Sequence, residues 1–300
     1  MLMLLRSMLV IFSLTACERL DHGPQEDASL SVSRAMSTQA DAGFARADTA
    51  RRFEFPADHG PHPEYALEWW YFTGNLEQED GRRFGYQLTL FRIGLQPPAA
   101  RTDSAWRSQA LYMGHLAVSD IAEQRHYSEE RFSRAAAGLA GAEMSPLKVW
   151  LGPWSIEGEQ KDTFPINLKA AGDEVSINLR LAQGDKPVVL QGDRGLSQKG
   201  AQEGNASYYY SHTRLPTQGT ITVGKNDYVV QGNSWFDREW SSSALDETQQ
   251  GWDWFALQLD DGRDLMFYRM RGKDGAAQHF SKGVLVDADG RVEPLTLDNT

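Results

Sequence analysis

From residue 51 onward, the sequence is a succession of short apolar or aromatic runs that Gly, Pro, Asn and Asp interrupt. Such runs, separated by turn-forming residues, are typical of β-strands joined by tight turns and are too short for ordinary helices. Many short strands in one chain favour an all-β sandwich or barrel. Residues 133–142, rich in Ala, are the only stretch that we expect to be helix-like.

The clearest predicted hairpin joins residues 68–76 (EWWYFTGNL) to residues 84–91 (FGYQLTLF), with the turn signal Asp80-Gly81 between them. Further strands in the same block are predicted at 110–118, 148–151, 166–170, 175–181 and 188–191. A second block follows the Gly- and Gln-rich segment 192–204, with predicted strands at 220–223, 228–231, 252–259, 265–271 and 284–286.

A weak internal repeat relates the two blocks. Residues 68–76 align with residues 251–259 (GWDWFALQL) at a constant offset, and an Asp-Gly turn and a strand follow each copy. Self-similarity of this kind indicates duplication of one β unit. We therefore predict two tandem antiparallel β-barrels, over residues 51–195 and 205–300. Because the last predicted strand lies close to residue 300, either the second barrel is open or the sequence is incomplete.

The first sixteen residues have the composition of an export signal. Arg6 is their only charged residue, and the apolar run 8–14 is too short to span a bilayer, which takes about 20 residues. The order Leu-Thr-Ala-Cys that ends at Cys17 resembles the bacterial lipobox, in which the cysteine is acylated. We predict a signal peptide over residues 1–16, lipidation of Cys17 and a polar tether over residues 17–50.

Charge and cysteine content narrow the range of partners. A net charge of -11 argues against binding to nucleic acid or anionic lipid. Cys17 is the only cysteine, which excludes a disulfide scaffold and a cysteine-based metal site. We therefore expect membrane attachment through the acyl chains alone, with the body facing the periplasm. An Asp directly after the acylated cysteine would resemble an inner-membrane retention signal. This chain has Glu18 at that position, which favours the outer membrane.

Residues 232–240 (GNSWFDREW) hold the densest set of reactive groups. In an extended strand, Trp235 and Asp237 lie on one face. Burial among aromatic side chains disfavours a carboxylate and raises its pKa, and a neutral carboxylic acid can donate a proton. Asp237 is therefore the first candidate catalytic residue. The alternative is that Asp237 pairs with Arg214 or Arg238 and stabilises a turn.

Histidines form the second group of candidates. His212, in the segment 208–214 (YYYSHTR), either orients an acid or a water molecule or is an ordinary core histidine. His59 and His62, with Glu68 nearby, are metal-ligand residue types, but the Gly-Pro between them indicates a turn, so we expect no metal. The chain has no G-x-S-x-G elbow, dinucleotide-binding glycine motif or P-loop, and no cofactor is expected.

The chain contains 9 Trp, 10 Tyr and 13 Phe. Most of them will pack in the core, but in β-barrels that hold one small ligand some aromatic residues line an apolar cavity. The candidate ligand-binding residues are Trp69, Trp70, Tyr210, Arg214, Trp235 and Trp240.

The segments at 68–76, 232–240 and 251–262 (GWDWFALQLDDG) resemble the AttH-type, lipocalin-like proteins, a family grouped with the carotenoid 1,2-hydratases (hydroxyneurosporene synthases). The resemblance extends from about residue 51 to the end of the sequence. It implies two tandem lipocalin-like β-barrels, in agreement with the repeat. Members of the family usually continue beyond the point at which this sequence stops.

In the hydratases of this group an Asp protonates an isoprenoid double bond, and the resemblance assigns that role to Asp237 and an assisting role to His212. The chain departs from the pattern at Arg214, where the hydratases place a Trp, and at Trp235, where they place a Tyr. A guanidinium close to a developing carbocation would oppose it. We therefore expect first an exported lipoprotein that binds an apolar or isoprenoid-like ligand, in connection with an ABC-type membrane transporter. The alternatives are hydration of an isoprenoid C=C bond and a structural lipoprotein that binds another protein.

Overall fold

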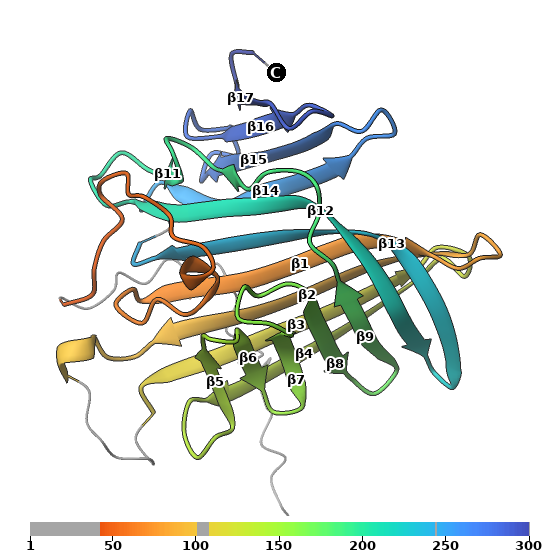
Figure 1. Ribbon diagram of the computed structural model, residues 1–300. Coiled ribbons are helices and arrows are strands. Elements are labelled where there is room, and N and C mark those ends of the chain that lie inside the picture. The colour runs from red at the N-terminus through yellow and green to blue at the C-terminus, as the bar shows by residue number, and fades with distance from the viewer. Residues whose placement is uncertain (1–42, 101–107, 244, 300) are drawn as a thin grey trace, which may run out of the picture. The chain divides into compact units, whose positions relative to one another are not determined.

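Among the described residues, the regular secondary structure is almost entirely β-strand (Figure 1). The structure is a computed structural model that describes residues 43–100, 108–243 and 245–299. The predicted signal peptide, Cys17 and the tether up to residue 42 lie outside the described residues. Among the described residues, the two helices are single 3₁₀ turns, η1 (Ala57–His59) and η2 (Pro98–Ala100). Neither is long and apolar enough to cross a membrane.

Strands β1 to β13 belong to one large antiparallel sheet. Its strands are β1 (Leu67–Glu77), β2 (Arg83–Gly94), β3 (Ala110–Asp120), β4 (Arg125–Arg134), β5 (Ala140–Glu143), β6 (Lys148–Leu151), β7 (Trp154–Gly158), β8 (Ile166–Ala171), β9 (Val175–Leu181), β10 (Val189–Leu190), β11 (Leu196–Gln198), β12 (Ala206–Val223) and β13 (Asn226–Ser241). A second sheet contains β14 (Gln249–Gln258), β15 (Asp264–Gly272), β16 (Lys282–Val286) and β17 (Val292–Thr296).

The strand order of the large sheet is β4-β3-β2-β1-β13-β12-β9-β8-β7-β6-β5, with β10 and β11 paired to β12. The sheet curls, so that β5 to β9 lie in front of β1 to β4 in Figure 1. The small sheet has the order β14-β15-β16-β17 and remains open. The predicted fold class, an all-β antiparallel and lipocalin-like architecture with an incomplete second barrel, is confirmed.

Local sequence signals located most strands correctly. The predicted hairpin is β1–β2, paired from Leu67↔Ile93 to Glu77↔Arg83. The other copy of the repeat is the hairpin β14–β15. The copies differ in burial, since Phe72 is inaccessible whereas the aligned Phe255 is 52% exposed.

The predicted helix-like stretch at residues 133–142 is wrong. Strand β4 ends at Arg134, a turn follows, and β5 begins at Ala140. Ala137 and Gly138 have φ values of 52° and 72°. This left-handed conformation cannot continue a right-handed helix, and it reverses the chain instead.

Two segments beside predicted domain boundaries join the body of the fold. Strands β12 and β13 pair with each other and with β9 and β1, so the chain after residue 205 first completes the large sheet before it forms the small one. Residues 43–50, assigned to the tether, pack on the body: the amide of Ala45 donates to the Glu64 carbonyl at 2.9 Å, and Ala47 is inaccessible. Small alanine side chains allow this segment to lie close to the sheet.

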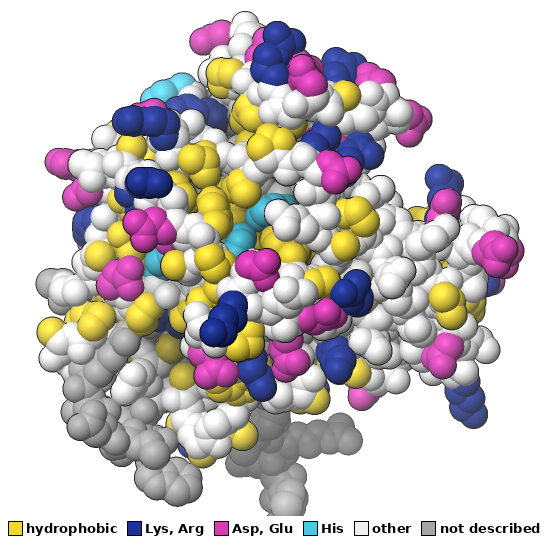
Figure 2. Space-filling view, viewed as in Figure 1, with side chains coloured by type: hydrophobic (Ala, Val, Ile, Leu, Met, Phe, Trp, Pro, Cys, Tyr) yellow, Lys and Arg dark blue, Asp and Glu magenta, His cyan; other side chains and the backbone are white. Residues whose placement is uncertain are grey.

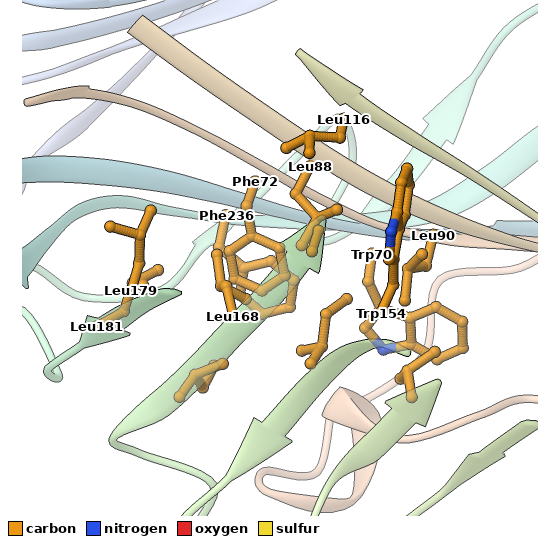
Figure 3. Packing of buried hydrophobic residues seen from close by; sticks show 14 of the residues in the cluster. Trp70, Phe72, Leu88, Leu90, Leu116, Trp154, Leu168, Leu179, Leu181 and Phe236 are labelled. Atoms are coloured by element: carbon orange, nitrogen blue, oxygen red, sulfur yellow. The ribbon is translucent and has the colours of Figure 1, made fainter. Parts of the chain in front are cut away.

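The main core fills the curl of the large sheet (Figure 3). Trp70 and Phe72 from β1 and Phe236 from β13 point toward Trp154 and Leu168 from β7 and β8. The rings of Phe72 and Phe236 are stacked with centroids 4.3 Å apart. Because side chains of a strand alternate between faces, the neighbours of these core residues point out of the barrel.

A buried ion cluster closes one end of this core. The Glu68 carboxylate accepts hydrogen bonds from the guanidinium groups of Arg92 and Arg238, and it also accepts the His62 amide at 2.9 Å. Arg238 lies over the Trp70 ring at 4.0 Å. Burial alone would raise the pKa of Glu68, but Arg92 and then Arg238 hold it well below its usual value. The motif EWWY therefore supplies an anion that neutralises two buried cations.

Candidate functional site

A cleft of about 380 Å³ lies on the outer face of the large sheet, against the small sheet. Trp69 and Tyr71 reach it because they alternate with the core residues of β1. Their partners in the β1–β13 ladder are Glu239 and Asp237, which point into the same cleft. The remaining wall includes the aromatic side chains Phe91, Tyr209, Trp252, Trp254 and Tyr268.

Asp237 is held in this cleft by three hydrogen-bond donors. The hydroxyl of Tyr209 donates to Oδ2 at 2.8 Å, and the Ser211 hydroxyl and the Trp235 indole N–H donate to Oδ1 at 2.5 and 2.7 Å. Trp254 in turn donates to the Tyr209 hydroxyl at 3.3 Å. These contacts fix the orientation of the carboxyl group against the aromatic wall.

The pKa of Asp237 is raised to about 7. Burial is the largest cause, because it disfavours the charged carboxylate, and the Glu239 carboxylate adds to it; the three donors act in the opposite direction but do not offset the burial. At neutral pH a substantial fraction of Asp237 is therefore a neutral acid. A neutral carboxylic acid in an apolar site can protonate a bound molecule, and its carboxylate can take a proton back.

An ion pair lies two residues further along β13. Lys199 Nζ is 3.2 Å from Glu239 Oε1, which also accepts a hydrogen bond from the Ser207 hydroxyl. The Lys199 ammonium lies over the Tyr268 ring at 4.0 Å. Burial by itself lowers the pKa of Lys199, but the adjacent Glu239 carboxylate more than offsets this and the pKa is raised.

The structure divides the candidate residues between the two faces of the sheet. Asp237, Trp235 and Trp69 lie on the cleft side. The other candidates pack in the main core or beside it: Trp70, Tyr210, His212 and Trp240. Asp237 pairs with Ser211 in the ladder, so the adjacent His212 points away from it. The structure therefore does not bring the predicted pair Asp237 and His212 together.

Neither arginine considered as a partner of Asp237 contacts it. Arg214 binds Asp264, with Nε to Oδ1 at 2.9 Å, and donates to the Leu259 carbonyl. Arg238 belongs to the Glu68 cluster on the core side. The interpretation of Asp237 as an ion-paired turn residue is therefore wrong, and Arg214 links the two sheets.

His212 sits in an aromatic environment in the core. Its ring is stacked on Phe236 with centroids 5.9 Å apart, and it lies 5.5 Å from the His59 ring. Its Nε2 atom is buried without a hydrogen-bond partner among the described residues. Burial lowers the pKa of His212 to about 4, so it is neutral at pH 7.

Replacing His212 by Phe is expected to stabilise the protein by about 1 kcal/mol at pH 7, because it removes an unsatisfied buried nitrogen. The wild type should also lose stability as the pH falls from 6.5 through about 4, since the lowered pKa of folded His212 makes the unfolded chain bind the proton first. Urea midpoints at pH 7 and 4.5 measure both effects. His126→Phe, at an exposed position of β4, is the control. If His212→Phe and the wild type lose equal stability between pH 7 and pH 4.5, this prediction is contradicted.

Several site residues were missed in the sequence. Tyr209 and Ser211 lie on the face of β12 opposite to that of the predicted Tyr210 and His212. The pairing of β12 with β13, which sets Ser211 opposite Asp237, is the signal that identifies them. Lys199 comes from the Gly- and Gln-rich segment and carried no local signal. Within the described part of the chain, no group of three or more His, Cys, Asp or Glu residues has an arrangement that holds a metal.

A curled antiparallel sheet, a second sheet packed on its outer face and an acid in the cleft between them define a two-sheet, lipocalin-like protein with an acid site. The chain belongs to the AttH-like family, which matches residues 46–300. An AttH protein from Nitrosomonas europaea, solved as a crystal structure, shares 34% sequence identity with this chain. The two structures match with a TM-score of 0.75 over 85% of this chain and 76% of that one.

More distant solved structures share the fold. Kievitone hydratase from Nectria haematococca matches 87% of this chain and 73% of its own at 12% identity and a TM-score of 0.61. CghA, solved with Sch210972, matches 84% of this chain and 67% of its own at 13% identity and a TM-score of 0.52. A search of curated proteins found no match.

Proposed function

We propose that this chain binds an apolar, isoprenoid-like small molecule in the cleft between its two sheets. The observation that carries the proposal is the aromatic lining of a cavity of about 380 Å³, which is within the range of small-ligand sites. Trp69, Trp252 and Trp254 offer flat apolar surfaces on opposite walls. The polar lining consists of Asp237, the pair Lys199 and Glu239, and Gln87, Thr89 and His115, which can orient an otherwise apolar ligand.

Titration with geraniol is expected to quench the tryptophan emission in a saturable manner, because three tryptophans line the cleft. Trp254→Phe should reduce the amplitude of quenching, whereas Trp150→Phe should leave it unchanged. Trp150 is the matched control, since its indole donates to the Gly138 carbonyl far along the sheet, on β6. Linear, non-saturable quenching in the wild type, or the same amplitude in both variants, would remove the basis of this proposal.

Asp237 supports a second candidate function, hydration of an isoprenoid C=C bond. The neutral Asp237 acid would transfer its proton to one alkene carbon, water would add to the resulting tertiary cation, and the Asp237 carboxylate would take the proton released by that water. The aromatic faces of Tyr71 and Trp254 would stabilise the cation, an attraction of about 2 kcal/mol when desolvated. Arg214 pairs with Asp264 and is not among the residues that line the cleft, which weakens the objection that its charge opposes the cation. The likeness to kievitone hydratase concerns the fold alone.

Export and lipidation of Cys17 are also proposed, on the grounds of the N-terminal sequence. The tether would hold the cleft next to a membrane, where apolar ligands partition, and an ABC-type transporter is a further proposed partner. Wild-type protein expressed in a bacterium is expected to incorporate labelled palmitate and to fractionate with the outer membrane, whereas Cys17→Ser should do neither. Equal labelling of the two proteins would exclude acylation at this cysteine.

A further inference from the structure

The ion pair of Lys199 and Glu239 has unused hydrogen-bonding capacity at the wall of the cleft. Both groups are buried, with 10% and 7% of their side chains accessible, and both line the cavity. Oε1 of Glu239 forms the ion pair with Lys199 and accepts the hydrogen bond from the Ser207 hydroxyl. Oε2 accepts no hydrogen bond from the described residues. Oε2 of Glu239 is also accessible, unlike the fully inaccessible side-chain atoms without a hydrogen-bond partner in the described part of the chain.

The Lys199 ammonium is similarly under-used. An ammonium carries three N–H donors. Across the described residues, its polar partner is one Glu239 oxygen, and its other neighbours are the ring faces of Tyr209 and Tyr268, at 5.1 and 4.0 Å. A free donor and a free acceptor therefore lie side by side in the wall of a mainly aromatic cleft.

The chemistry of this pair selects one kind of ligand group. A hydroxyl both donates and accepts, so it can donate to Glu239 Oε2 and accept from Lys199 Nζ at once. A carboxylate or an ammonium is attracted by one member of the pair and repelled by the other, so it would bring an uncompensated charge into a buried site. A hydrocarbon would leave both charges desolvated without a new partner. The pair as a whole is neutral, which also matches an uncharged ligand.

We infer that Lys199 and Glu239 bind a hydroxyl group of the ligand, so that the cleft takes an isoprenoid or phenolic alcohol in preference to a hydrocarbon, an acid or an amine. The inference rests on the proposed function, because it concerns the polar group of the same ligand. Glu239 is two residues from Asp237 on β13, which places the hydroxyl roughly 7 Å along the strand from the Asp237 acid. The unsaturated carbon chain then extends from the anchor past Asp237.

The test compares four probes that share one carbon skeleton: geraniol, 2,6-dimethyl-2,6-octadiene, geranic acid and geranylamine. Tryptophan quenching at pH 7 is expected to show geraniol binding about tenfold more tightly than the hydrocarbon, the gain that one or two net hydrogen bonds provide. The acid and the amine should bind more weakly than the alcohol. In the double variant Lys199→Met with Glu239→Met, which removes both charges together, the preference for the alcohol should disappear.

The matched control is Lys148→Met with Glu157→Met, a solvent-exposed pair 3.6 Å apart on β6 and β7. It should keep the wild-type preference. Equal affinity for geraniol and the hydrocarbon in the wild type, tightest binding of the acid or the amine, or an unchanged preference in the Lys199 and Glu239 variant overturns this inference alone. Failure of all four probes to bind the wild type overturns the proposed function instead. If the double variant does not fold, the wild-type ranking of the four probes decides.

Discussion

Asp237→Asn is expected to lower the rate of the proposed isoprenoid hydration by about 10²- to 10⁴-fold, the usual contribution of a positioned acid. The amide keeps the shape of the carboxyl group. Its single oxygen can still accept from Ser211 and Trp235, and its NH₂ group can donate to the Tyr209 hydroxyl, so geraniol binding should persist. The readout is incorporation of labelled oxygen from water into the tertiary alcohol, beside the quenching titration. Asp193→Asn is the control, because that side chain is 73% exposed and does not line the cleft. Equal turnover in Asp237→Asn and the wild type would rule out the assigned role.

The pH dependence of the same reaction tests which form of Asp237 acts. A proton donor must be protonated, so turnover should be high below pH 7 and fall as the pH rises through about 7, the raised pKa of Asp237. The Ser211 hydroxyl stabilises the carboxylate and lowers that pKa. Ser211→Ala should therefore move the midpoint of the profile to higher pH. If the midpoint stays in place or moves to lower pH, Asp237 does not set the pH dependence.

Glu68→Gln is expected to destabilise the fold by about 3–5 kcal/mol, a typical cost of removing one partner from a buried ion cluster. Arg238 is inaccessible and Arg92 is 3% exposed, so both guanidinium groups would remain buried without a counter-charge. The pKa of Glu68 is held well below its usual value by Arg92 and Arg238, against the effect of burial, so the carboxylate is charged at neutral pH. Urea unfolding followed by circular dichroism measures the loss.

The control for this variant is Glu159→Gln. Glu159 accepts from Arg180 at 2.7 Å, but the pair lies on the surface, with 34% and 44% of the two side chains accessible. Water and salt replace such a contact readily, so the urea midpoint should stay within error. A Glu68→Gln midpoint that also stays in place would contradict a stabilising role of the cluster.

Local patterns predicted the elements of this fold well and their assembly less well. The hairpin β1–β2 and the runs that became β6 and β9 were identified because alternation and turn residues are local properties. The helix-like residues 133–142 were misread because alanine content says little when the backbone turns at Ala137 and Gly138. No local pattern shows that residues 206–241 extend the large sheet, because β13 pairs with β1, more than 100 residues earlier in the chain, and β12 pairs with β9.

The sequence by itself determined the family, the β class and the face that Asp237 shares with Trp235, since alternation along one strand follows from the backbone. Only the tertiary structure decided which groups meet Asp237. The register that sets Ser211 opposite Asp237 sends His212 to the core and brings Tyr209 to the acid. A shift of one residue would exchange these two sets, because the side-chain period of a strand is two. Lys199 reaches the cleft from a loop, and burial between two sheets raises the pKa of Asp237; both are consequences of long-range packing.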